Sequence, residues 1–189
     1  MPGTKALKEP SEVLAEIGAK KMDPSATIMK QITLITDGAC IGNPGPGGWA
    51  CILRYDRDEM ELAGGVDDTT NNRMEIQAVL EGLKALKEPC EVSLISDSRY
   101  LLDGLLTWSI TWRKNGWVRR RKTKTYPLAN ADLWQELDAL AAKHTIHGQW
   151  IKGHSGHLDN ERCDALAQAQ ASVHIDVHMQ RRTIHKLIS

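Results

Sequence analysis

A β-strand and a tight turn are encoded together in QITLITDGACIGNPGPGG, residues 31–48. Residues 31–36 alternate β-branched and apolar side chains, which predicts a strand that ends at Asp37 and Gly38. α/β proteins commonly place their chemistry at strand ends. The glycines of the following turn also let other groups approach closely. Asp37 is therefore the first candidate for a functional residue.

The composition of the 189 residues predicts one globular domain with a substantial core. Lys and Arg number 24, and Asp and Glu also number 24, so net charge alone predicts no anionic partner. The four cysteines are widely spaced without a CxxC motif, which favours reduced thiols in the cytoplasm. No apolar run reaches a membrane-spanning length, and the N-terminus lacks an apolar signal core. We expect a cytoplasmic monomer with no membrane partner.

The remaining hydrophobic patterns alternate between strands and helices. Strands over residues 49–55 and 60–66, joined by short turns, predict an antiparallel meander with the first strand. The further elements are expected in this order: a helix over 71–87, a strand over 91–96, helical spacing over 99–108, a helix over 129–144, a strand over 145–151 and a helix over 161–171. Helices between strands imply right-handed crossovers onto a parallel part of the sheet. The fold class is therefore α/β, with a mixed sheet.

The chain divides into one domain and two flanking segments. We interpret residues 1–29 as a mobile N-terminal extension, although residues 11–21 also have the spacing of a short amphipathic helix. The domain covers residues 30–171. Residues 172–189 form a C-terminal tail with weak strand alternation, to which we assign no function.

A basic stretch, WSITWRKNGWVRRRKTKT, covers residues 108–125 of the domain. It holds seven basic residues and no acid between Arg113 and Lys124. Clustered lysine and arginine neutralise phosphates, and tryptophan offers bases and sugars an apolar face. The pattern favours a protrusion that binds nucleic acid; the alternative is a solvated charged loop with tryptophans in the core. Trp134 and Trp150 lie on apolar faces and are expected in the core.

Four acids lie at the ends of predicted elements. Asp37 and Asp97 end the first and fourth strands, while Glu75 and Asp164 lie in the first turns of two helices. Each alone has an ordinary explanation as a turn residue, a capping residue or a solvated helix acid. Together they are expected to converge, because the C-terminal ends of parallel strands meet at the edge where the following helices begin.

Convergent carboxylates repel one another unless a cation lies between them. Carboxylate oxygens suit Mg²⁺ or Mn²⁺, and no cysteine set or paired histidines nearby indicate zinc. Two such ions roughly 4 Å apart can hold the attacking and leaving oxygens of a phosphoryl displacement. The acids therefore predict metal-dependent phosphoryl chemistry.

Four motifs carry a family resemblance: TDGACIGNPGPGG, TTNNRMEIQA, SDSRY and KGHSGHLDNERCDALA. In this order and spacing, roughly residues 30–170 resemble ribonuclease H type 1 of the handle-bearing bacterial kind, bacterial ribonuclease HI. The resemblance implies a ribonuclease H-like fold, a five-stranded mixed sheet flanked by helices. It also implies an endonuclease that uses two Mg²⁺ ions, with Mn²⁺ as a substitute, to hydrolyse the RNA strand of RNA/DNA hybrids. The implied products have 5′-phosphate and 3′-hydroxyl ends.

The same resemblance assigns roles to individual residues. Asp37, Glu75, Asp97 and Asp164 match the catalytic acids that bind the metals, and His154 matches a histidine that assists proton transfer or product departure. The implied substrate-binding residues are Asn43, Asn71 and Asn72 at the minor groove, Thr70 at a phosphate of the DNA strand, Trp108 and Trp112 in the DNA channel, and Arg113, Lys114, Arg119, Arg120, Arg121 and Lys122 in the protrusion.

Two positions and two rival functions stay open. Glu161 either supports a metal's outer shell or is a solvated helix acid. Arg99 stands where many bacterial relatives carry a neutral amide, and a cation there would tighten phosphate contact. One rival is a nuclease or strand-transfer enzyme of the same fold that acts on DNA, against which the pair Asn71 and Asn72 and the basic protrusion argue. The other is a non-catalytic hybrid-binding module, which would need an incomplete set of acids.

Overall fold

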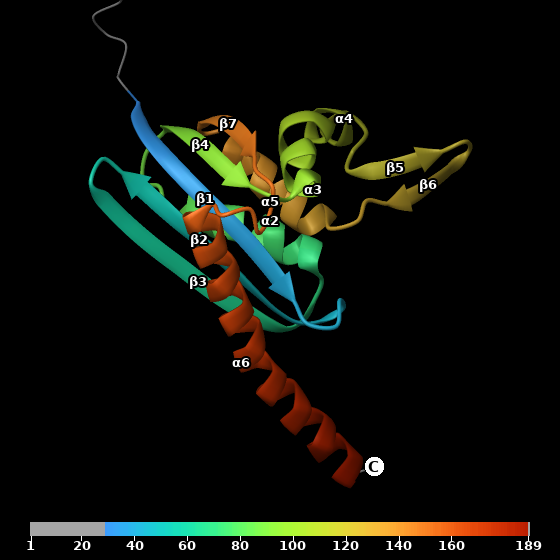
Figure 1. Cartoon of the computed structure of the whole chain (residues 1–189). Helices are drawn as coiled ribbons and strands as arrows, with labels where there is room; N and C mark the ends of the chain where they lie inside the picture. The colour runs from blue at the N-terminus through green and yellow to red at the C-terminus, as the bar shows by residue number, and fades with distance from the viewer. Residues whose placement is uncertain (1–28, 189) are drawn as a thin grey trace, which may run out of the picture.

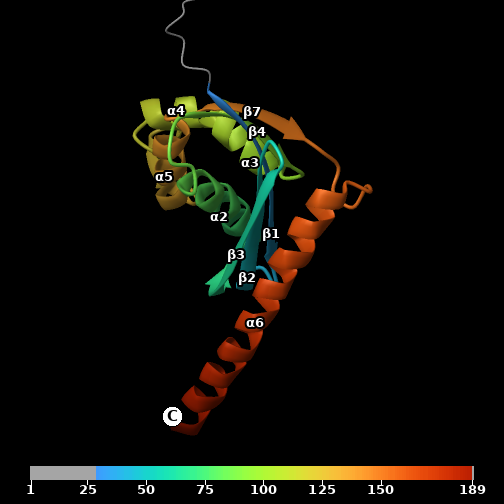
Figure 2. The same ribbon diagram turned by 90° about the vertical axis from the view of Figure 1, so that its left-hand side faces the viewer.

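A computed structural model of the chain describes the backbone of residues 29–188 and the side chains of residues 29–175. The extension predicted over residues 1–29 lies outside the described residues, except for Met29. A five-stranded mixed sheet forms the centre of the described part, with helices on both faces (Figures 1 and 2). The predicted fold class is confirmed.

The central sheet has the strand order β3-β2-β1-β4-β7. Its strands are β1 (Lys30–Cys40), β2 (Gly45–Tyr55), β3 (Asp58–Thr69), β4 (Cys90–Ser96) and β7 (Thr145–Trp150). The first three form the predicted antiparallel meander, whereas β4 lies parallel to β1 and β7 parallel to β4. Leu34 pairs with Leu53 on one side and Leu94 on the other, and all three are buried. The alternating residues of the first strand therefore build the centre of the sheet.

Helices pack on both faces of this sheet. They are α2 (Asn71–Lys84), α3 (Arg99–Asp103), the π-helix η1 (Gly104–Trp108), α4 (Ser109–Lys114), α5 (Ala131–Ala141) and α6 (Leu158–Ile188). Figure 2 shows α2, α3, α4 and α5 on one side of the sheet and α6 on the other. The larger core includes Leu80 and Trp134, and a smaller core joins Ile35 and Ile52 to Cys163 of α6. Among the described residues, no helix is both long and apolar enough to cross a membrane.

The weak strand alternation of residues 172–189 does not correspond to a strand, because α6 continues through Ile188. The helix is already packed on the sheet before the tail begins. Ala167 and Ala171 are buried, and α6 lies so close to Gly48 of β2 that a side chain on this glycine would collide with the helix backbone. Extending a formed helix costs far less than nucleating one, so a helix already packed on the sheet propagates into the tail.

The basic protrusion contains more regular structure than its sequence predicts. After α4 come two short strands, β5 (Val118–Arg121) and β6 (Lys124–Pro127), which pair as an antiparallel hairpin. Lys122 in the turn adopts a left-handed conformation, with φ of 53°. Figure 1 shows this hairpin extending away from the body of the domain. Its strands have no apolar face, so the period-two signal that identifies a half-buried strand is missing from the sequence.

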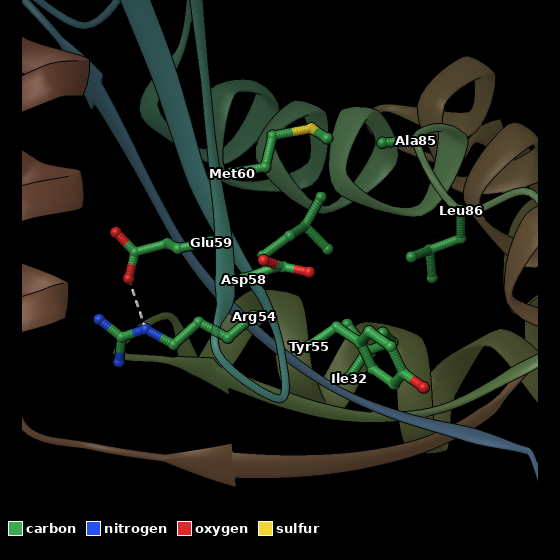
Figure 3. A pocket seen from close by; sticks show the side chains of 9 residues that line it. Ile32, Arg54, Tyr55, Asp58, Glu59, Met60, Ala85 and Leu86 are labelled. Atoms are coloured by element: carbon green, nitrogen blue, oxygen red, sulfur yellow. Dashed lines mark hydrogen bonds and ion pairs between the residues drawn. The ribbon is translucent and has the colours of Figure 1, made fainter.

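An apolar pocket of about 190 Å³ lies near the start of β1. Figure 3 shows Ile32 of β1, Tyr55 and Met60 of the β2–β3 hairpin, and Leu86 beyond α2 around it. None of the predicted site residues lines this pocket. Asp37 lies toward the other end of β1, and the candidate active site is there.

Candidate active site

Asp37 and Asp97 lie where two neighbouring parallel strands part. The ladder between β1 and β4 stops at the pair Ile35 and Ile95, and each acid follows two residues later. The prediction that the first strand ends at Asp37 and Gly38 is wrong. β1 continues to Cys40 by pairing with β2. Asp37 therefore lies just beyond the point where β1 loses β4 as a neighbour.

Glu75 comes close to Asp37 because β1 and α2 touch directly. Gly38 lies against the backbone of Met74 and Glu75, where a side-chain carbon would collide with it. Gly38 N also donates a hydrogen bond to Asp37 Oδ1 at 2.7 Å. One carboxylate oxygen each of Asp37, Glu75 and Asp97 lies within 4.8 Å of the other two. Three of the four predicted acids thus form one group, called here the acid cluster.

Asp37 and Glu75 of the acid cluster are buried, Asp97 is half-buried, and the negative charges of the cluster oppose one another. Asp37 is 6% and Glu75 is 4% exposed. Burial, and then the charge of Asp97, raise the pKa of Asp37 to about 7. Burial, followed by the charge of Asp37, raises the pKa of Glu75 well above its usual value. Glu75 Oε2 is buried and has no hydrogen-bond partner among the described residues.

A divalent cation fits the acid cluster. A buried polar oxygen without a partner is costly, and a bound ion or water is the usual way to satisfy it. Carboxylate oxygens from three separate elements match the ligand preference of Mg²⁺ and Mn²⁺. The three ligating groups include no sulfur and no imidazole, so nothing in them selects zinc.

Asp164 lies at the margin of the acid cluster. The sequence predicts it in the first turn of its helix, but α6 begins at Leu158, which puts Asp164 in the second turn. Its oxygens are not among those that lie within 4.8 Å of one another. Burial and the charges of the other acids raise the pKa of Asp37 and of Glu75, and the charge of Asp164 makes a smaller contribution in the same direction. Gln168 Nε2 donates a hydrogen bond to Asp164 Oδ1 at 2.7 Å. The fourth acid is therefore close to the cluster and held by its own helix.

His154 lies on the loop before α6, with its Nδ1 3.7 Å from Asp164 Oδ2. Its side chain is 77% exposed, and its backbone is left-handed with φ of 51°. Gly156 N on the same loop donates a hydrogen bond to Glu161 Oε1 at 2.9 Å. Glu161 therefore holds the loop to the start of α6.

Two of the predicted minor-groove amides are linked to each other. Asn71 N donates a hydrogen bond to Asn43 Oδ1 at 3.0 Å, and Asn71 Nδ2 lies 3.5 Å from Glu75 Oε1. Thr70 is the N-cap residue of α2, so Asn72 and Glu75 both lie inside the helix, and the explanation of Glu75 as a capping residue is wrong. Asn72 is exposed. The turn after β1 and the start of α2 together present amide groups beside the acid cluster.

Trp108 and Trp112 belong to an aromatic cluster. The ring centroid of Trp108 lies 5.7 Å from that of Trp112 and 6.2 Å from that of Tyr100, and Trp108 is 39% exposed. Trp112 packs at 5.2 Å on Trp134, which is buried as predicted and donates from Nε1 to Tyr100 Oη at 3.1 Å. These contacts fix a partly exposed tryptophan surface, which suits the stacking of nucleic-acid bases or sugars.

Trp150, predicted in the core, is 40% exposed. It ends β7, which is an edge strand of the sheet. Alternating apolar residues on an edge strand do not ensure that another element packs over them. Trp150 Nε1 donates a hydrogen bond to the backbone oxygen of Asp97 at 2.9 Å, and the Arg99 guanidinium lies 4.0 Å from the Trp150 ring centroid.

The explanation of Asp97 as a capping residue is wrong. Ser98 caps α3 by accepting a hydrogen bond from the backbone of that helix.

The basic residues of the protrusion differ in their partners. Arg113 donates two hydrogen bonds, of 2.9 and 2.5 Å, to Asp138 and is therefore already neutralised. Lys114 is exposed. Residues 119–121 and Lys122 are also exposed, and no acid among the described side chains pairs with them. The hairpin charges are therefore available to an anionic partner.

Asn160 is a residue near the acid cluster that we did not predict. It is 2% exposed, and its Nδ2 donates a hydrogen bond to Asp97 Oδ2 at 3.4 Å. A signal for it exists in the sequence, because its spacing to Cys163 and Ala167 puts it on the buried face of the helix. A buried amide needs hydrogen-bond partners, so an asparagine on this face predicts another polar group beside it.

Replacing Asp37 with asparagine is expected to stabilise the metal-free protein at pH 8 by on the order of 1–4 kcal/mol. The folded-state pKa of Asp37 is raised to about 7, so its ionised form destabilises the fold. This penalty is absent below the unfolded pKa near 3.8, grows as pH rises and is complete above 7. Thermal unfolding in a chelator measures it, with Asp56→Asn in the exposed β2–β3 turn as the control. A gain that persists unchanged at pH 4 would contradict this explanation.

Comparisons with known proteins give the family of the chain. The model of the RNase H family matches residues 29–172. The Ribonuclease H of Chelativorans sp. (strain BNC1) is 57% identical over 141 residues, which cover 75% of this chain and 85% of that protein. The Ribonuclease H of Aeromonas hydrophila is 52% identical over 145 residues, covering 77% and 92%.

Solved structures share the same fold. The crystal structure of LC9-RNase H1, a type 1 RNase H with the type 2 active-site motif, matches with a TM-score of 0.70 at 29% identity, over 79% of this chain and 76% of that chain. LC11-RNase H1 in complex with RNA/DNA hybrid matches with a TM-score of 0.54 at 21% identity, over 76% and 99%. The family match, the curated relatives and the fold agree, and the chain belongs to the RNase H family.

Proposed function

We propose that this chain is an endonuclease that hydrolyses the RNA strand of RNA/DNA hybrids and leaves 5′-phosphate and 3′-hydroxyl ends. The observation that carries the proposal is the acid cluster of Asp37, Glu75 and Asp97 in a chain of the RNase H family. Two of these acids are buried, and one oxygen of Glu75 has no hydrogen-bond partner among the described residues. Residues 30–171 are the catalytic domain in this proposal.

Two Mg²⁺ ions, for which Mn²⁺ can substitute, are the proposed cofactors. When bound, such ions supply a water of lowered pKa and neutralise charge on the attacked phosphate. Asp37, Glu75 and Asp97 would hold them, with Asp164 as a further ligand at the margin. His154 would move a proton near the departing product; its exposure and its 3.7 Å distance from Asp164 support this role.

The proposed hybrid contacts begin at the amides beside the acid cluster. Asn43, Asn71 and Asn72 would meet the minor groove, and Thr70 would meet a phosphate of the DNA strand. The hydrogen bond between Asn71 and Asn43 supports this assignment, because it keeps two amide groups together next to Glu75. An amide both donates and accepts, so it can pair with a hydroxyl in either sense.

The remaining proposed contacts lie on the DNA channel and the protrusion. Trp108 and Trp112 would offer apolar faces to the DNA strand. Arg119, Arg120 and the neighbouring cations of the hairpin would neutralise phosphates. Arg113 is a weaker candidate than its neighbours, because Asp138 already occupies its guanidinium.

The experiment that tests the function compares end-labelled RNA/DNA hybrid, duplex DNA and duplex RNA, each with and without Mg²⁺. We expect cleavage of the RNA strand in the hybrid alone, and only with the metal. Cleavage of duplex DNA at a comparable rate would favour the DNA-acting rival. Tight binding of hybrid without any cleavage would favour a non-catalytic binding module.

Replacing Arg119, Arg120, Arg121 and Lys122 with alanine is expected to weaken hybrid binding and flatten its salt dependence, by up to about one log-log unit for each lost phosphate contact. Cleavage at saturating substrate should change little, because these residues lie on the hairpin and outside the acid cluster. Binding titrations over a range of KCl concentrations measure the slope.

The matched control for the hairpin variant is the pair Arg57→Ala and Lys87→Ala, two exposed cations outside the hairpin. This pair should leave the salt slope nearly unchanged. A hairpin variant with the slope of the parent chain would show that the hairpin does not touch the nucleic-acid backbone.

We further propose that the chain acts as a monomer in the cytoplasm. All residues of the proposed site come from a single chain, which supports a monomeric active unit. The four cysteines are free thiols, which supports a reducing compartment. Sedimentation of the protein with and without hybrid would measure the number of chains in the active complex.

A further inference from the structure

Asn160 is a buried amide in the first turn of α6 that contacts an acid 63 residues away in the sequence. Its Nδ2 donates a hydrogen bond to Asp97 Oδ2 at 3.4 Å, and its backbone N donates to His157 Nδ1 at 3.3 Å. Its Oδ1 is buried and has no partner among the described residues. The amide therefore faces Asp97 with its donor, while its acceptor stays unsatisfied.

Asp97 is held at three points. Trp150 Nε1 donates to its backbone oxygen at 2.9 Å, and Gly153 lies so close that a side chain there would collide with Asp97 Oδ2. Of the three contacts, only that of Asn160 is a hydrogen bond to the carboxylate. Loss of this amide would free the carboxylate to turn while the backbone of Asp97 stays in place.

The start of α6 is fixed independently of Asn160. Arg54 donates two hydrogen bonds of 2.6 Å to Asp159, the residue before Asn160. Arg54 also pairs with Glu59, and Arg162 of α6 pairs with the same Glu59, both at 2.6 Å. These ion pairs join the first turns of α6 to β2 and β3, so a change of the Asn160 side chain should leave the helix where it is.

Packing alone does not explain an asparagine at this position. A buried oxygen without a partner is costly, and leucine has the same branched side-chain shape without that cost. A hydrogen bond that orients a metal-binding carboxylate, in contrast, commonly matters for metal affinity. The arrangement therefore points to a role at Asp97 that stability does not require.

We propose that Asn160 is a positioning residue that fixes the Asp97 carboxylate in the orientation that binds a divalent cation. This inference rests on the proposed function, in which Asp97 holds a metal ion. Asn160 itself touches neither the substrate nor the reacting atoms in this proposal. It acts by restricting the side-chain rotation of Asp97.

The test titrates Mg²⁺ against the full chain without substrate and follows the rise of the unfolding temperature. Asn160→Leu should bind Mg²⁺ roughly 10–100-fold more weakly than the parent chain. Its unfolding temperature in a chelator should be equal or higher, because the unsatisfied oxygen is gone. With hybrid, KM should change little and kcat should fall at low Mg²⁺ and recover at high Mg²⁺.

A neighbouring variant separates this role from a merely structural one. Asp159→Asn breaks the pair with Arg54 in the same helical turn, so it should lower the unfolding temperature and leave Mg²⁺ affinity within about twofold. Asn160→Ala provides a second substitution should the leucine not fit, and it should lose the same Mg²⁺ affinity despite its smaller volume.

The outcomes separate this proposal from the function on which it rests. A parent chain whose unfolding temperature does not respond to Mg²⁺ would overturn the proposed metal site, and with it the role of Asn160. A parent chain that responds, beside Asn160 variants that respond at the same Mg²⁺ concentration, would overturn the positioning role alone. Weaker Mg²⁺ binding in both Asn160 variants, with Asp159→Asn unaffected, would support it.

Discussion

Replacing Asp97 with asparagine is expected to lower the rate of hybrid cleavage by about 10³-fold or more. A metal held by carboxylates stabilises charge on the transition state by several kcal/mol, and each 1.4 kcal/mol corresponds to a factor of ten in rate. Asp97 is one of three acids whose oxygens lie within 4.8 Å of one another, so neutralising it deprives the metal site of a charged ligand. Asparagine keeps the size of the side chain, and the fold should persist.

Single-turnover cleavage of labelled hybrid, together with binding measured by fluorescence anisotropy, separates the two effects of Asp97→Asn. Binding should stay within a few-fold of the parent chain, because the contacts proposed for the hybrid lie on other residues. Asp56→Asn, a substitution of an exposed turn acid, should cleave like the parent. An Asp97→Asn chain that cleaves at near the parent rate would remove Asp97 from the catalytic acids.

A DNA strand that carries a few consecutive ribonucleotides, paired with DNA, is expected to be cut only within the ribose run. All-DNA duplex should be cut at below about 10⁻³ of the hybrid rate. Each 1.4 kcal/mol of lost transition-state stabilisation lowers the rate about tenfold, so the loss of a few hydroxyl contacts is enough for this difference. The acid cluster cannot make this distinction, since the attacked phosphate is the same in both. Only RNA displays a 2′-hydroxyl in the wide minor groove.

The linked amides beside the acid cluster are the candidates for this distinction. Asn71 donates to Asn43 Oδ1 from its backbone N, so Asn71→Ala keeps this hydrogen bond and removes only the side-chain amide of Asn71. Asn71→Ala should therefore lose more activity on the short ribose run than on full hybrid, where other hydroxyl contacts remain. Gln135→Ala, a change of an exposed amide on α5, is the matched control. All-DNA cleavage at a rate comparable to hybrid would refute the ribonuclease assignment.

The corrections to the predicted elements have a common physical cause. Local patterns report what a segment prefers, while the layer that covers it is set elsewhere in the chain. Trp150 lies on an alternating strand but at the uncovered edge of the sheet, and it is exposed. Val173 and Ile175 have the spacing of a strand, but they continue a helix, α6, whose preceding turns already pack on β2. In the basic hairpin only Val118 is partly buried, so the strands have no alternating apolar pattern in the sequence.

By itself the sequence determined the order, along the chain, of the strands in the central sheet and of the helices between them, and it gave the four candidate acids. Strand alternation, helical spacing and motif residues are local properties of the chain. Only the tertiary structure decided how these acids relate to one another. Asp37 and Asp97 meet because β1 and β4 part at the same register, and Glu75 joins them because Gly38 lets α2 touch β1. Asp164 stays at the margin, and Asn160 reaches Asp97 across 63 residues, because α6 is fixed on the sheet by ion pairs to β2 and β3. Distances between elements depend on packing, which no local pattern encodes.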